Sequence, residues 1–278
     1  MKIYVQSRGK PQNKDYTWLK SEENHLYREI PPILKRISIA KLIDSRKYSI
    51  VVARDDGELV LLVTGLSSQR NDFMNRQIRN SVAWVVDDNP ENEKIIRSLA
   101  VCVLTDREKV ENEVNEAVNE TEANSDYEFN VNSEKINQLS DIKVESYSNP
   151  NEDNYIGSYS IELQQEIGLE LQTNPLPNRD GILVLLTSLK TESALKEYKV
   201  WRGLSAKVSS NELTPVYSNS QKQLSKKKTG SGHRSGHRSG HNSNIDQIYR
   251  ELNTIAEEMK EITKELQKRK SEDKKPGG

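Results

Sequence analysis

Two stretches of the chain end an apolar run in hydroxyl and basic residues, and this pattern offers the clearest opportunity for chemistry. Residues 56–68 read DGELVLLVTGLSS and residues 180–191 read DGILVLLTSLKT, nearly the same text 124 positions later. If such strand ends meet at one end of a sheet, backbone amides, hydroxyls and cations can hold an anion such as phosphate. The candidate anion or nucleic-acid contacts are Arg8, Thr64, Arg70, Arg76, Arg79, Thr187 and Lys190.

The same residues also have a purely structural interpretation, which we favour. The repeat lacks the glycine spacing and the Lys-Ser/Thr pair of a P-loop, and it lacks GxGxxG. Strands commonly end in such residues because they form turns. The three arginines of SSQRNDFMNRQIRNS, residues 67–81, predict either a phosphate-contacting strip or a solvated loop with paired charges.

Other chemistry-bearing residues give weaker signals. Three of the four histidines, His233, His237 and His241, recur every fourth residue, but the intervening Ser-Gly pairs prevent the stable helix that would align them on a metal. The single cysteine, Cys102, lies in the apolar text SLAVCVL, which predicts a buried thiol. We find no catalytic constellation in the sequence, so we lean against an enzyme and expect neither a cofactor nor a metal.

Composition indicates that much of the chain lies outside a core. Apolar residues make up 33% of the 278 residues, and the 13 glycines raise this share to only about 38%, against roughly 45–50% in typical globular chains. One cysteine excludes an internal disulfide framework. The start lacks the apolar core of a signal peptide, and no run approaches the roughly 18 apolar residues of a membrane span. We therefore expect a soluble, cytoplasmic protein.

The first 105 residues predict the beginning of an α+β head with a mainly antiparallel sheet and a few helices. An Asp-Gly turn between two apolar runs predicts a hairpin, and Asn89-Pro90 predicts a helix start. The expected elements are strands at 2–6, 48–53, 58–64 and 78–86, a short helix at 31–44, and a helix after Asn89.

The middle of the chain predicts an interruption and then a return to the sheet. Residues 106–155 are rich in Glu and Asn and carry one thin valine stripe, which predicts an acidic low-complexity insertion, a solvated helix that frays into linker. Residues 156–206 predict the second part of the head. Their run GILVLLTS at 181–188 is typical of a strand buried on both faces and should complete the sheet. Residues 161–171 fit a helix or a strand.

The last part of the chain predicts a flexible linker and a coiled coil. Residues 207–243 form a basic linker rich in Gly, Ser and His, 244–271 a coiled-coil helix, and 272–278 a disordered tail. Leucine at position a with isoleucine at position d favours trimers or tetramers over dimers. The predicted interface residues, spaced alternately 3 and 4 apart, are Ile245, Ile248, Leu252, Ile255, Met259, Ile262 and Leu266.

These features predict a non-enzymatic adaptor or assembly protein. A narrow apolar seam on a short helix is stable only against a partner, so we expect a homo-oligomer or a partner helix. Clustering several heads would raise their effective concentration for a shared target, as in a prokaryotic signalling or defence assembly. The alternative is a nucleic-acid- or nucleotide-binding regulator that uses the basic residues of head and linker. An enzyme with its site at the strand ends is a third hypothesis.

Overall fold

A ten-stranded mixed sheet organises the described part of the chain in a computed structural model. The structure describes residues 1–22, 25–121, 129–147 and 151–216, all within the compact unit Met1–Lys222. Only the pairs β10–β11 and β11–β9 of this sheet are parallel. The α+β class with a mostly antiparallel sheet is therefore confirmed. The strand order is β12-β9-β11-β10-β4-β5-β6-β1-β2-β3.

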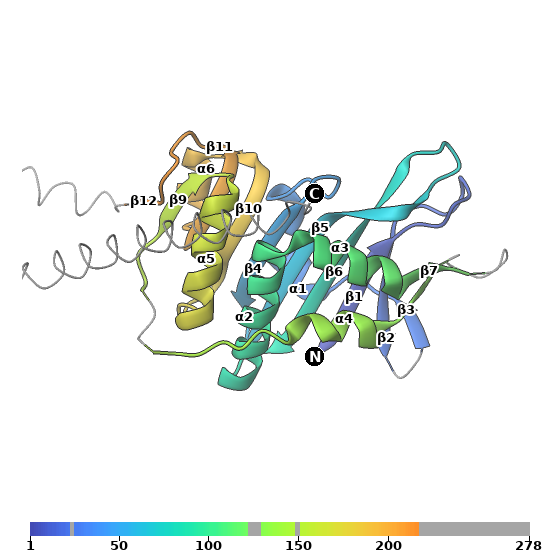
Figure 1. Cartoon of the computed structure of the whole chain (residues 1–278), viewed down its shortest axis with the longest axis horizontal. Coiled ribbons are helices and arrows are strands. Elements are labelled where there is room, and N and C mark those ends of the chain that lie inside the picture. The colour runs from blue at the N-terminus through green and yellow to red at the C-terminus, as the bar shows by residue number, and fades with distance from the viewer. Residues whose placement is uncertain (23–24, 122–128, 148–150, 217–278) are drawn as a thin grey trace, which may run out of the picture. The chain divides into compact units, whose positions relative to one another are not determined.

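Twelve strands and eight helical segments occur among the described residues (Figure 1). The strands are β1 (Lys2–Ser7), β2 (Thr17–Glu22), β3 (His25–Arg28), β4 (Ser49–Asp55), β5 (Glu58–Asn71), β6 (Gln77–Asp87), β7 (Val118–Glu120), β8 (Phe129–Val131), β9 (Tyr155–Ser158), β10 (Gly181–Thr191), β11 (Arg202–Lys207) and β12 (Thr214–Pro215). The α-helices are α1 (Pro32–Arg36), α2 (Pro90–Thr105), α3 (Arg107–Ala117), α4 (Ser133–Asn137), α5 (Ile161–Thr173) and α6 (Glu192–Glu197), and the 3₁₀ turns are η1 (Ile39–Lys41) and η2 (Gln138–Ser140).

The predicted hairpin and the predicted helix start are confirmed. Asp56 and Gly57 have φ values of 49° and 73°, the paired positive angles that a two-residue turn between antiparallel strands needs. After β6, the Asn89 side chain accepts a hydrogen bond from the Asn92 amide at 2.9 Å, and Pro90 is the first residue of α2. Local turn and cap chemistry therefore determines both elements.

Strand β10 joins the two halves of the head into one sheet, as predicted. It pairs antiparallel with β4 on one side and parallel with β11 on the other, and residues 182–187 are buried. The two similar stretches are thus β5 and β10, the two neighbours of β4. They differ in their turns, because Asp180-Gly181 follows a loop and makes no hairpin.

The ambiguous stretch 161–171 is a helix, and its glycine has a packing role. Helix α5 begins after Ser160, whose hydroxyl accepts from the Leu163 amide. It packs against α2 so closely that a Cβ on Gly168 would lie 2.8 Å from Thr105 Cγ2. A larger residue would push the two helices apart.

The segment 106–155 corrects the expectation of a solvated insertion. Helix α3 buries Val110, Val114 and Ala117 fully, and β8, α4 and η2 add Phe129 and Ile136 to the same core. The valine stripe is narrow, but α3 packs against both β5 and α4, so its neighbours supply the remaining apolar surface. Residues 207–216, assigned to the linker from sequence, likewise carry β12, which pairs with β9.

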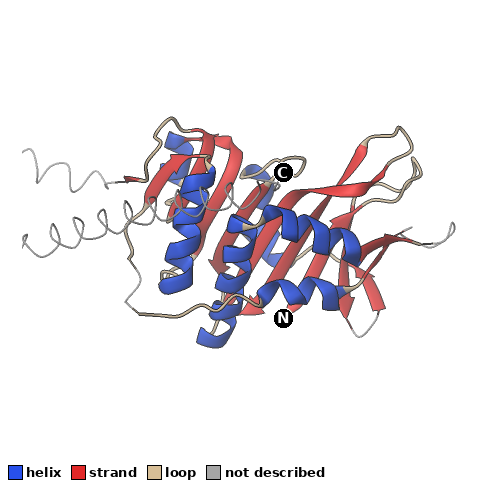
Figure 2. Cartoon of the chain, viewed as in Figure 1, coloured by secondary structure: helices blue, strands red, loops and turns tan. Residues whose placement is uncertain are grey.

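Helices cover the two faces of the sheet unequally (Figure 2). On one face α2, α3, α4 and α5 contribute to a core that includes Trp84 and the buried Cys102 thiol. On the other face the smaller core receives side chains from α1 and α6 only. The predicted helix at 31–44 is broken there into α1 and η1 by Ser38, which has a φ of 53°.

Several sequence predictions concern residues outside the described part of the chain. These are the remainder of the linker from 217, the histidines His233, His237 and His241, the coiled coil at 244–271 with its seven interface residues, and the tail. Within the described ranges, no helix has the length and apolar character needed to cross a membrane.

We expect Gly65→Ala to destabilise the head far more than Gly57→Ala. Both glycines have a left-handed φ, 71° and 73°, so each substitution carries about 1 kcal/mol of backbone strain. A Cβ on Gly65 would also lie 2.2 Å from the Lys47 carbonyl carbon, whereas nothing lies within 4 Å of one on Gly57. Urea unfolding should show an additional loss of about 2 kcal/mol or more for Gly65→Ala. Equal losses would contradict this packing.

Candidate functional site

The strand ends predicted to meet do meet at one end of the sheet. Strand β6 is antiparallel to both β1 and β5, and β4 is antiparallel to both β5 and β10. The C-terminal ends of β1, β5 and β10 therefore point the same way. Thr64 pairs with Ser49 at the start of β4, and Thr187 follows Leu186, the partner of Ile50. The two threonines thus flank the beginning of β4 from either side.

Both threonine hydroxyls are engaged by the backbone of the loop before β4. Thr64 Oγ1 donates to the Lys47 carbonyl at 3.3 Å, and Thr187 Oγ1 donates to the Leu42 carbonyl at 2.9 Å. The Lys190 ammonium lies 5.7 Å from the centre of the Tyr198 ring. These contacts favour the structural interpretation for all three residues, because they hold the loop and α6 on the sheet.

A small cationic pocket opens beside these threonines at the ends of the strands. Its volume is about 330 Å³, and four basic residues line it: Arg46, Lys47, Arg79 and Arg107. Of these, sequence analysis selected Arg79 alone. A signal for the others exists, because Arg46-Lys47 immediately precede β4 and therefore sit at the end of the sheet where β5 and β10 finish. We call this the strand-end pocket; its other lining residues are Tyr48, Gly65, Tyr159, Ser188 and Ala206.

Arg107 forms one wall of the strand-end pocket. Its guanidinium carbon lies 4.4 Å from the centre of the Tyr48 ring, and Nη2 donates to Glu111 Oε1 at 2.8 Å. The same Glu111 oxygen accepts from the Ser67 amide at 2.9 Å. Burial disfavours the charged form of Glu111, but these hydrogen bonds outweigh it and lower its pKa. Arg107 thus remains paired on one side while its face covers Tyr48.

Polar groups deeper in the strand-end pocket lack charged partners. The Ser188 hydroxyl is buried and has no hydrogen-bond partner among the described residues. Burial raises the pKa of the Tyr159 phenol and that of the Tyr48 phenol, whose hydroxyl donates to the Val103 carbonyl. The pocket therefore offers cations and neutral donors, a combination suited to an anion.

The distal parts of β5 and β6 form a second feature, a two-stranded ribbon with an ordered turn (Figure 1). We call residues 66–80 the finger. Asp72 organises its turn: Oδ1 accepts from the Met74 and Arg76 amides, both at 2.9 Å, and Oδ2 pairs with the Arg76 guanidinium at 2.8 Å. Asn75 has a φ of 59° and donates its amide to the Asp72 carbonyl.

The arginines predicted to contact anions brace the finger instead. Arg8 is buried and reaches Asp72 Oδ2 at 3.4 Å, with its guanidinium 5.8 Å from the centre of the Phe73 ring. Arg70 donates to the Ser7 hydroxyl and to the Arg8 carbonyl, and burial lowers its pKa. Arg79 donates to the Ser67 hydroxyl across the ribbon. The structure thus gathers the four arginines, but mainly as supports for the finger.

The finger presents two apolar side chains at its tip. Phe73 is 43% exposed and Met74 is 60% exposed, although the turn beneath them is held by the buried carboxylate of Asp72. Sequence analysis did not select either residue. The available signal was the pair Phe-Met inside an otherwise polar turn, NDFMNR. A braced turn with an exposed apolar tip is suited to contact with another protein.

Comparison with protein-family models, curated proteins and solved structures finds no match to this chain.

Alkaline pH should destabilise the head through Tyr48. The unfolded chain releases this proton near pH 10, whereas the folded pKa is higher, so stability is intact below about pH 10 and then falls by about 1.4 kcal/mol per pH unit. Urea unfolding from about pH 8 to about pH 11 measures this slope, and Tyr48→Phe should flatten it. Tyr147→Phe, at a position 76% exposed, is the matched control and should keep the wild-type slope. An unchanged slope in Tyr48→Phe would refute the assignment.

Proposed function

We propose that this protein is a non-enzymatic, cytoplasmic adaptor or assembly factor. In this proposal the head uses the finger to contact a protein partner, and the C-terminal region joins several copies or recruits a partner helix. We place it in a prokaryotic multi-protein signalling or defence system.

The observation that carries the proposal is the use of the arginines. A nucleic-acid contact needs accessible guanidinium groups facing phosphates, but Arg8 is buried and Arg70 is engaged by Ser7 and the Arg8 carbonyl. Both instead support a turn that exposes Phe73 and Met74. Apolar anchors on a rigid element are typical of protein-binding sites, because little conformational entropy is lost on binding.

The apolar seam from Ile245 to Leu266 supports the second half of the proposal. Seven consecutive core positions obey heptad spacing, and the Leu and Ile placement favours more than two chains. Joining several heads would turn a weak contact at each finger tip into strong binding to a multivalent target.

We expect the full chain to be a trimer or tetramer and a chain ending at Ser243 to be a monomer. Light scattering after size exclusion measures both masses. The full chain with Phe73→Ser and Met74→Ser is the control: its mass should equal that of the wild type, because the finger is assigned to a different partner.

Each outcome of this experiment separates the two halves of the proposal. A monomeric full chain would eliminate self-association and leave a partner helix as the only use of the seam. A change in mass in the finger variant would instead make the finger a self-association surface. The proposed assignment of the finger would then be wrong.

A second candidate function is a nucleotide- or nucleic-acid-binding regulator. The strand-end pocket favours it, because four basic and no acidic side chains line a volume of about 330 Å³ at the end of the sheet. Lys47 is exposed and Arg79 is half-buried, so both charges can reach a phosphate.

Lys47→Glu combined with Arg79→Glu tests this second function. Fluorescence anisotropy of a labelled single-stranded oligonucleotide would report binding at several salt concentrations. If the pocket contacts phosphates, the double variant should bind more weakly and lose about 0.7 of the logarithmic salt slope per contact. Lys94→Glu, an exposed charge reversal on α2, is the matched control. Equal binding by both variants would remove the strand-end pocket from consideration.

A further inference from the structure

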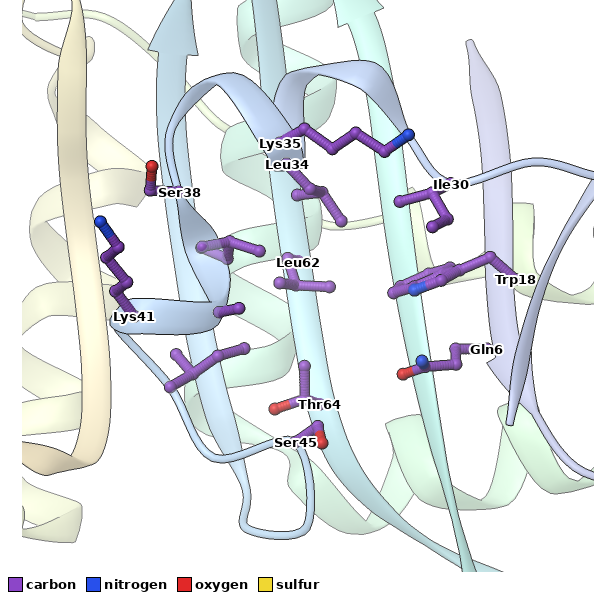
Figure 3. A pocket seen from close by; sticks show the side chains of 13 residues that line it. Gln6, Trp18, Ile30, Leu34, Lys35, Ser38, Lys41, Ser45, Leu62 and Thr64 are labelled. Atoms are coloured by element: carbon purple, nitrogen blue, oxygen red, sulfur yellow. The ribbon is translucent and has the colours of Figure 1, made fainter. Parts of the chain in front are cut away.

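A separate hollow lies on the opposite face of the sheet, beneath α1 and η1 (Figure 3). Its volume is about 560 Å³, within the range of about 300–1,000 Å³ typical of small-molecule sites. The sheet supplies one side through Gln6, Trp18, Leu62 and Thr64, and the chain from Ile30 to Ser45 supplies the other. We call it the α1 groove.

The length and break of α1 explain why the α1 groove is open. The helix begins at Pro32 and ends after five residues, and Ser38 then takes a left-handed conformation that starts η1. Such a short cover protects the side chains of β4 and β5, such as Val51 and Val60, but leaves Trp18 on β2 only partly buried. The groove is therefore bounded by the ends of the helical cover.

The interior of the α1 groove is apolar and contains one flat aromatic surface. In Figure 3, Leu34, Leu62 and Trp18 lie across its middle, with Ile30 above the indole. Trp84 and Trp201 are fully buried, whereas Trp18 is half-buried and lines the groove. Ile30 is 47% exposed, which is unusual for a side chain beside so much apolar surface.

The charge at the rim of the α1 groove is positive and uncompensated. Lys35 and Lys41 lie on two sides of the opening, and no acidic residue lines it. Neighbouring Arg36 pairs with Asp55 and Glu58 at 2.6 and 2.7 Å, so its charge is neutralised on the other side of α1. Neither lysine has such an ion pair within the described ranges.

We infer that the α1 groove binds a small organic anion with an apolar, planar body. The body would stack on Trp18 and contact Leu62, and its carboxylate, sulfonate or phosphate would pair with Lys35 or Lys41. The adjoining hollow over β2 and β3 contains both Arg28 and Glu29, whose charges oppose one another. The preference for an acid therefore belongs to the part beneath α1. This inference does not depend on the finger or on oligomerisation.

Anilinonaphthalene sulfonate is the probe, and phenylnaphthylamine, its uncharged analogue, is the comparison. Titration of the full chain, followed by probe emission and by tryptophan emission, gives both affinities. We expect the sulfonate to bind more tightly than the neutral probe and to quench Trp18. Lys35→Glu with Lys41→Glu should weaken sulfonate binding about tenfold and leave the neutral probe unchanged. Lys94→Glu should affect neither probe.

A filling variant keeps the test independent of charge. Ala40 is exposed and lines the α1 groove, so Ala40→Trp should preserve folding and weaken both probes. Circular dichroism would verify that every variant is folded. Equal affinity for the two probes in the wild type, or sulfonate binding unaffected by the lysine reversals or by Ala40→Trp, would overturn the inference.

Discussion

Strands β4, β5, β6 and β10 are buried on both faces, and the need to cover both faces determines what the remaining elements of the head do. One face receives α2, α3, α4 and α5 and forms the larger core. The other receives α1 and α6, which have only five and six residues. This second layer therefore ends before the sheet does. The α1 groove lies at that limit, since β1 and β2 continue the sheet beyond the helical cover.

Buried guanidinium groups are the second organising feature, because each must be hydrogen-bonded where water is excluded. Arg97 donates to the Leu171 and Glu145 carbonyls and to Ser146, which joins α2, α5 and an irregular segment. Arg202 pairs with Glu170 and also donates to the Asp153 carbonyl. Arg8 and Arg70 do the same at the base of the finger. In this head, an arginine in the sequence more often indicates a structural tie than a ligand contact.

Elements specified by adjacent residues could be predicted, whereas those specified by distant partners could not. The Asp-Gly turn, the Asn89 cap and the continuous apolar run of β10 are local signals, and all three led to correct elements. The burial of Val114 depends on β5 and α4, and the helical state of Gly168 depends on a contact with Thr105. The finger is similar, because Arg8 and Asp72 lie 64 positions apart. Its arginines were recognised as a group, but their partners were invisible in the sequence.

The pairing of β4 with β10 has a consequence for synthesis on the ribosome. Strand β4 ends at Asp55 and β10 begins at Gly181, so 126 positions separate the two strands. At about 5–20 residues per second, roughly 6–25 s pass between the emergence of β4 and that of its partner. During this interval the apolar strand SIVVARD has one unpaired backbone edge, which can template pairing with another nascent chain. Polysomes bring such chains close together, so the nascent head is most vulnerable to aggregation before its second half emerges.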